Sequence, residues 1–205
     1  MTDQITVFSD YVCPFCYLGR QSLDEYQESR EEELEIDWHP FDLRSNQRNE
    51  DDEIVRESGH DEEYYEQARK NVERLKAEHD ADEMVVDRPK EIDSLDAQVA
   101  SYYVKEHYDY ETWLAFDESI FTAHWEEERD IGDVDVLADL AEEAGVDPEE
   151  VRDAVSDDTL REEVKAKFSE AHQKGVTGVP TFAYEGYAAR GAVPPEQLRR
   201  LVEGQ

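Results

Sequence analysis

Cys13 and Cys16 are the only two cysteines among the 205 residues, and they stand where an apolar run meets a proline. The run Ile5-Thr6-Val7-Phe8 predicts a short buried strand. Pro14 suits the first turn of a helix, because its missing N–H would have no partner there in any case. The chain is therefore expected to pass from a strand into a helix at two thiols whose spacing lets a disulfide close and open.

The remaining pattern predicts an α/β fold in the order β-α-β, a helical block, then α-β-β-α. A helix is expected over about 14–30 and a second, parallel strand over 34–39. Polar residues 45–61 predict a loop, and a helix after them carries an apolar stripe of Tyr64, Tyr65, Ala68, Val72 and Leu75. Strands over 181–184 and 187–190 flank a Glu185-Gly186 turn, and Pro194-Pro195 begins the last helix. We expect a core of 1–45 and 175–205, with a helical insertion over 46–174 that a helix at about 158–174 joins to the core.

The position of the two cysteines suggests different roles for them. As the predicted N-cap, Cys13 would direct its sulfur at the free N–H groups of Phe15 and Cys16, which favours thiolate over thiol. Cys16 would lie one turn later, more buried and less ionised. Cys13 is therefore the predicted nucleophile and Cys16 the resolving cysteine. Because Pro14-Phe15 carries no cation, we expect a couple nearer about −200 mV than about −120 mV.

Zinc binding, a structural disulfide and a chance pairing each account for the two cysteines less well. A zinc site needs about four ligands, and the six histidines show no paired ligand spacing. A structural disulfide would close a very short loop and stabilise little. A position directly after a strand disfavours a chance pair.

Val179-Pro180 comes just before the late apolar run. An ordinary proline at a strand start explains it, but a cis bond beside the dithiol would leave the Val179 backbone free to pair with an extended substrate.

The amino-acid composition limits which classes of binding partner are expected. The formal charge of −34 disfavours nucleic acids and anionic membranes as partners. Asp and Glu outnumber 14 Arg and only 7 Lys, a balance similar to that of haloarchaeal proteins, whose carboxylate repulsion is screened in strong salt. No signal-like or membrane-spanning segment is visible, so we expect a halophilic, cytoplasmic protein in which a lone cysteine pair is catalytic or metal-binding rather than structural.

Several longer motifs resemble one family. Ser9-Asp10-Tyr11-Val12-Cys13-Pro14-Phe15-Cys16-Tyr17-Leu18-Gly19 resembles the opening of DsbA-family thiol–disulfide oxidoreductases, most closely the FrnE-like branch. The cis-proline loop of that branch is similar to residues 175–182, Gly-Val-Thr-Gly-Val-Pro-Thr-Phe. Ile120–Trp125, with Asp130-Ile131 soon after, is similar to the helical-insert pattern of that branch. Gly191-Ala192 is similar to the segment that follows its last strand.

The resemblance implies a thioredoxin-like fold, Cys13 as nucleophile, Cys16 as resolving cysteine and Pro180 as cis-proline. Substrate would meet Pro14, Phe15, Val179 and Pro180. Phe15 replaces the Trp that is frequent in the branch, and periplasmic members carry a His there and a signal peptide. The related 2-hydroxychromene-2-carboxylate isomerases and kappa-class glutathione transferases have Ser where this chain has Cys13, which favours redox chemistry here.

The sequence thus predicts a disulfide oxidoreductase that needs no cofactor and no metal. Its partners would be protein thiols or disulfides, with a low-molecular-weight thiol as a further option, and both a monomer and a homodimer stay open. A thiol-dependent isomerase or transferase and a non-catalytic binding module are the alternatives. Asp10, His39 and His124 are secondary candidates; for each, a turn or packing role fits the pattern at least as well, as it does for Trp125.

Overall fold

The computed structural model describes residues 3–55 and 62–204. Its elements follow the predicted order of types. They are β1 (Asp3–Ser9), α1 (Pro14–Glu28), β2 (Leu34–Pro40), the 3₁₀ turn η1 (Ser45–Gln47), α2 (Glu62–Glu78), α3 (Leu95–His107), α4 (Tyr110–Trp125), α5 (Val134–Glu143), α6 (Pro148–Ser156), α7 (Asp158–Gln173), β3 (Thr181–Tyr184), β4 (Tyr187–Arg190) and α8 (Pro195–Glu203). The α/β, thioredoxin-like fold with a helical insertion is confirmed.

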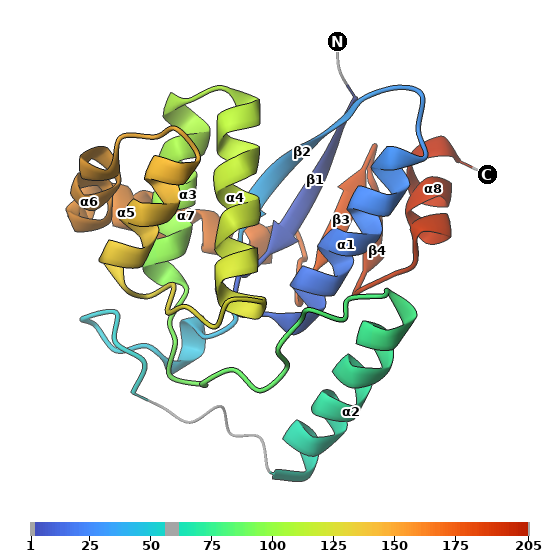
Figure 1. Cartoon of the computed structure of the whole chain (residues 1–205), viewed down its shortest axis with the longest axis horizontal. Coiled ribbons are helices and arrows are strands. Elements are labelled where there is room, and N and C mark those ends of the chain that lie inside the picture. Colours follow the sequence, from blue (N-terminus) through green and yellow to red (C-terminus); the bar gives the residue numbers. More distant parts are fainter. Residues whose placement is uncertain (1–2, 56–61, 205) are drawn as a thin grey trace.

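The four strands form one sheet in the order β2-β1-β3-β4. β1 and β2 run parallel with Ile5 beside Ile36 and Val7 beside Trp38, while β3 is antiparallel to β1 and to β4. Ile5 and Val7 point to the core shared with α1 and α8, whereas Phe8 points to the opposite face, where it packs near the end of α7. In Figure 1, α1 crosses one face of the sheet with α8 beside it. The carboxyl end of β1 therefore delivers the chain directly to the first turn of α1.

Helices α2 to α7 all lie in the chain between β2 and β3. Figure 1 shows α3 to α6 gathered beside the sheet, with α7 running behind them towards it. Asp109, Asp133, Asp147 and Asp157 each cap the N-terminus of a helix with a side-chain oxygen. The boundaries proposed for core and insertion stay a prediction.

The apolar stripe expected on α2 is buried only in part. Val72 is 2% exposed, but Tyr64 is 51% exposed. The reason is the position of α2, which Figure 1 shows apart from the other insertion helices and below α1. A helix with so few neighbours can bury only a narrow strip of its surface.

Candidate active site

Cys13 is the N-cap of α1, as predicted, with an extended backbone before Pro14 in the first turn. Its N–H donates to the main-chain oxygen of Asp10 over 3.1 Å, and its own oxygen accepts from Cys16 N over 3.0 Å. The tight turn at the end of β1 thus places both thiols on the first turn of the helix. Both cysteines are free.

Two details of the dithiol differ from the sequence-based expectation. The Cys13 side chain makes no cap hydrogen bond to the helix amides; its thiol instead donates to Val179 O over 3.7 Å. Burial does not distinguish the cysteines either, because each is 2% exposed. Burial, followed by the hydrogen bond and charge of Cys13, raises the pKa of Cys16 well above its usual value, which agrees with a resolving role.

The Val179–Pro180 peptide bond is cis. Val179 is half-buried and its carbonyl faces the Cys13 thiol, so the loop lies beside the dithiol as expected. Within the described residues the Val179 N–H donates no hydrogen bond. Pro14 and Phe15 are half-buried next to Cys13, whereas Pro180 is buried. The residues predicted to meet substrate are therefore brought together around one sulfur.

Gly19 is the residue whose role the sequence reasoning missed. A Cβ at this position would lie 3.0 Å from Cγ of Pro180 and 3.1 Å from Cζ of Phe182. The absence of a side chain therefore lets α1 approach the cis-proline loop closely. A glycine inside a helix costs about 1 kcal/mol relative to alanine. Its presence in the predicted helix is the one sequence signal that could have indicated a close contact here.

Asp10 lies at the end of β1 and is fully buried. Its Oδ1 accepts hydrogen bonds from Ser94 Oγ over 2.5 Å and Val12 N over 3.3 Å, and its Oδ2 from Leu43 N over 2.9 Å. Burial, reinforced by the charge of Asp42, raises the pKa of this carboxyl to about 6. Asp10 is thus a turn residue and also a titratable group behind the dithiol, whose charge helps to raise the pKa of Cys16.

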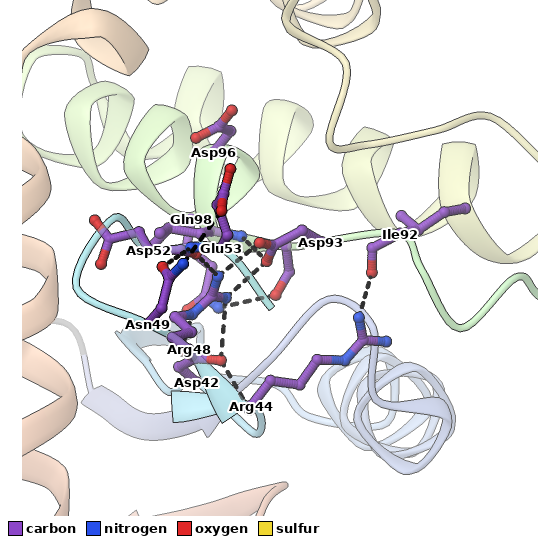
Figure 2. A network of polar contacts seen from close by, with 12 residues as sticks. Asp42, Arg44, Arg48, Asn49, Asp52, Glu53, Ile92, Asp93, Asp96 and Gln98 are labelled. Carbon is purple, nitrogen blue, oxygen red and sulfur yellow. Dashed lines mark hydrogen bonds and ion pairs between the residues drawn. The ribbon is translucent and has the colours of Figure 1, made fainter. Parts of the chain in front are cut away.

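A partly buried ionic network holds the segment that follows β2 against the start of α3. Arg48 binds Asp42 over 2.6 Å and Asp93 through two nitrogens over 2.6 and 2.7 Å, as Figure 2 shows. Arg44 donates to Ile92 O over 2.8 Å beside it. The network fixes the two segments that supply the Leu43 and Ser94 donors to Asp10.

A second network ties the dithiol loop to α4. Tyr11 OH donates to Asp117 Oδ1 over 2.7 Å, and Arg20 Nη1 donates to Asp117 Oδ2 over 2.7 Å. Trp125 Nε1 donates to Tyr11 O over 2.8 Å. Asp117 therefore holds one residue before and one after the two cysteines, an arrangement with no local sequence signal.

The two candidate histidines each pack against an aromatic ring. His39 packs on Phe8 with ring centroids 4.7 Å apart, and it faces Glu170 of α7 across 3.8 Å. This agrees with the packing role that the pattern favoured, because β2 turns this side chain to the same face of the sheet as Phe8. His124 is 2% exposed beside Trp125, and burial lowers its pKa to about 3.

Among the described residues no cluster of His, Cys, Asp or Glu could hold a metal ion, and no helix is long and apolar enough to span a membrane.

Known proteins that are similar to this chain in sequence or structure agree with this geometry. An uncharacterized Bacillus subtilis protein, YwbO, is 27% identical over 208 residues, which cover 100% of this chain and 98% of the relative. A probable DsbA oxidoreductase from Streptomyces coelicolor is 25% identical, with a TM-score of 0.76 over 98% of this chain and 90% of that one.

Two further structures share the fold at lower identity. A 2-hydroxychromene-2-carboxylate isomerase has 20% identity and a TM-score of 0.76 over 97% of this chain and 92% of that one. The cytosolic disulfide reductase DsbM from Pseudomonas aeruginosa, solved with GSH, has 22% identity and a TM-score of 0.57 over 97% and 92%. The family model described as a DSBA-like thioredoxin domain matches residues 4–203. With a dithiol at the start of α1, a cis-proline beside it and a match over nearly its whole length, this chain belongs to the DSBA-like thioredoxin domain family.

Proposed function

We propose that this chain is a thiol–disulfide oxidoreductase that works through Cys13 and Cys16. The observation that carries the proposal is the Cys13 thiol at the start of α1, 3.7 Å from the carbonyl of Val179 in the cis-proline loop. A thiol in this position can meet a substrate sulfur while the free Val179 N–H binds the substrate backbone.

The exchange has two balanced steps. The Cys13 thiolate attacks one sulfur of a substrate disulfide, so a Cys13–substrate bond forms and the other substrate sulfur leaves as a thiolate. Cys16 then loses its proton and attacks the Cys13 sulfur, which releases the second substrate thiolate. The substrate disulfide is reduced by two electrons and the dithiol becomes a disulfide. The reverse sequence oxidises a substrate dithiol.

The raised pKa of Cys16 supports this division of roles, because a thiol that keeps its proton does not compete with Cys13 for the first attack. Protein thiols or disulfides are the substrates we propose. The DsbM neighbour, solved with GSH, supports a low-molecular-weight thiol as a further partner and a cytoplasmic location.

Cysteine variants test the proposal in an insulin-reduction assay at high salt. Cys13→Ser should abolish exchange, and Cys16→Ala should accumulate mixed disulfides that a reductant releases. If the wild type did not reduce insulin, and a small-molecule isomerase or transferase activity with an added thiol survived Cys13→Ser, a thiol-dependent isomerase like the 2-hydroxychromene-2-carboxylate isomerase would account for the site better. A dithiol that does not react at neutral pH would instead indicate a binding module.

We also propose that the chain is of the FrnE-like branch and adapted to strong salt. The Cys-Pro-Phe-Cys and cis-proline motifs support the branch, and the net charge of −34 supports the salt adaptation. Carboxylate repulsion should destabilise the fold when salt is removed. The free energy of unfolding should therefore rise between about 0.1 and about 3 M KCl, where the Debye length falls from about 10 Å to below about 3 Å. A stability that is independent of KCl would contradict the adaptation but not the redox activity.

A further inference from the structure

The free edge of β4 is the unusual part of the surface. Among the described strands β4 pairs only with β3, and Figure 1 shows it at the side of the sheet next to α8. Tyr187 on this strand is 73% exposed, the highest value among the large hydrophobic side chains of residues 3–55 and 62–204. An open edge with an exposed aromatic side chain is a template for pairing with another strand.

The ladder shows which backbone groups face outwards. Gly191 N donates to Pro180 O over 2.8 Å, so 180 and 191 form a hydrogen-bonded pair. Hydrogen-bonded and non-hydrogen-bonded pairs alternate in an antiparallel ladder. Ala188, opposite Ala183, and Arg190, opposite Thr181, are therefore in the non-hydrogen-bonded positions. Their N–H and C=O groups point to the open edge, where no described residue pairs with them.

A groove lies beside this edge, between β4 and α8. Its volume is about 640 Å³, and its lining includes Tyr184, Tyr187, Arg200, Leu201 and Val202. Tyr187 and Ala189 alternate onto the same face, the one that α8 covers. Ala189 is buried under α8, whereas Tyr187 protrudes, so the face offers an aromatic ring beside a hollow.

Charge indicates what can approach this face. Residues 175–204 contain three acidic and three basic side chains, so the net charge of −34 belongs to the rest of the chain. Arg190, Arg199 and Arg200 are exposed and form no ion pair with any described residue. Two copies of a chain this acidic repel each other, and a segment with no net charge adds least to that repulsion.

We propose that β4 and α8 form the interface of a homodimer, in which the two β4 strands pair antiparallel about a two-fold axis at Ala188. In that register Ala188 exchanges both backbone hydrogen bonds with Ala188 of the partner subunit. Tyr187 lies opposite Ala189 of the partner subunit, so each exposed ring extends over the partner's groove. The contact is self-complementary, as a two-fold interface must be.

Sedimentation velocity at about 3 M KCl tests the dimer, because salt screens the repulsion between the acidic surfaces. The wild type should sediment as a dimer that weakens as KCl is lowered. Tyr187→Ala should raise the dimer Kd about tenfold or more, as expected for a central aromatic contact. Ala188→Pro removes an N–H that β3 does not use and should also favour the monomer. Tyr64→Ala, on α2, is the control and should leave the Kd unchanged.

A cross-link tests the register. In a hydrogen-bonded antiparallel pair the Cα atoms are about 5.5 Å apart, which suits a disulfide. Ala188→Cys in a background of Cys13→Ser and Cys16→Ser should therefore form a covalent dimer on mild oxidation, whereas Glu196→Cys in that background should not. A wild type that stays monomeric, variants that dimerise like the wild type, or no cross-link at 188 would each overturn the proposal. Exchange activity is measured separately and does not enter this test.

Discussion

Asp10 offers a quantitative test, because it is a buried carboxyl whose pKa rises from 3.8 to about 6 on burial. A carboxyl with a raised folded pKa binds its proton more tightly in the folded state. Its stabilising effect is complete below about pH 3.8 and is lost as the pH rises through about 6. A rise of this size in the pKa of Asp10 corresponds to about 3 kcal/mol of unfolding free energy.

The perturbation is Asp10→Asn, which removes the titration but keeps the size of the side chain. Unfolding free energies of the wild type and the variant should be measured by chemical denaturation from about pH 4 to about pH 7.5 at constant KCl, and then subtracted. The other titrating groups cancel in this difference. Relative to the variant, the wild type should lose about 2.5 kcal/mol across that range, because the unfolded carboxyl is already more than half ionised at about pH 4.

The hydrogen bond from Ser94 provides a matched variant. It lowers the pKa of Asp10, so Ser94→Ala should raise that pKa further and enlarge the loss of stability with rising pH. A difference curve between wild type and Asp10→Asn that is flat with pH would refute the reasoning. A wild type that loses stability relative to Asp10→Asn as the pH falls would refute it too, because Asp10 would then be ionised more easily in the folded protein than in the unfolded one.

Three other substitutions test the packing around the dithiol. Gly19→Ala should cost about 1–3 kcal/mol in denaturant unfolding and slow exchange, because its Cβ would collide with the cis-proline ring; Gly178→Ala, with no atom within 4 Å of its Cβ, is the control. Arg20→Met leaves Asp117 buried without its ion pair, so the unfolding free energy should fall by about 3–5 kcal/mol, and an unchanged value would contradict the network. The wild type should lose stability as the pH falls below 6.5, because the folded state keeps His124 neutral, and His124→Leu should remove this loss. Exchange rates should not change.

Much of the fold could be predicted from local patterns. The run before Cys13, the proline in the next turn and the Glu185-Gly186 turn are each short-range signals, and the structure confirms the elements they predict. Both Glu185 and Gly186 have positive φ, as a two-residue hairpin turn requires. The position of Val179–Pro180 beside Cys13 came from the family resemblance rather than from a local pattern, and it is confirmed.

What could not be predicted depends on contacts between distant parts of the chain. The resemblance did not say that Gly19 has to touch Pro180, that Ser94 and Leu43 donate to Asp10, or that Asp117 joins Tyr11 to Arg20. His39 shows the same limit, since its distance from the dithiol depends on which face of the sheet β2 turns towards the helices. Such pairings join residues up to 161 positions apart, as from Gly19 to Pro180, and carry no periodic signal.

The amino-acid order by itself determined the chemistry, because reactive groups and turn formers act over a few residues: two thiols one helical turn apart, a proline that starts the helix, and an extreme surface charge. The tertiary structure decided the surroundings of that chemistry. Burial, neighbouring charges and close contacts exist only when segments from β1, α1, α3, α4 and the cis-proline loop meet, and these are the quantities that set the pKa of Asp10 and of Cys16.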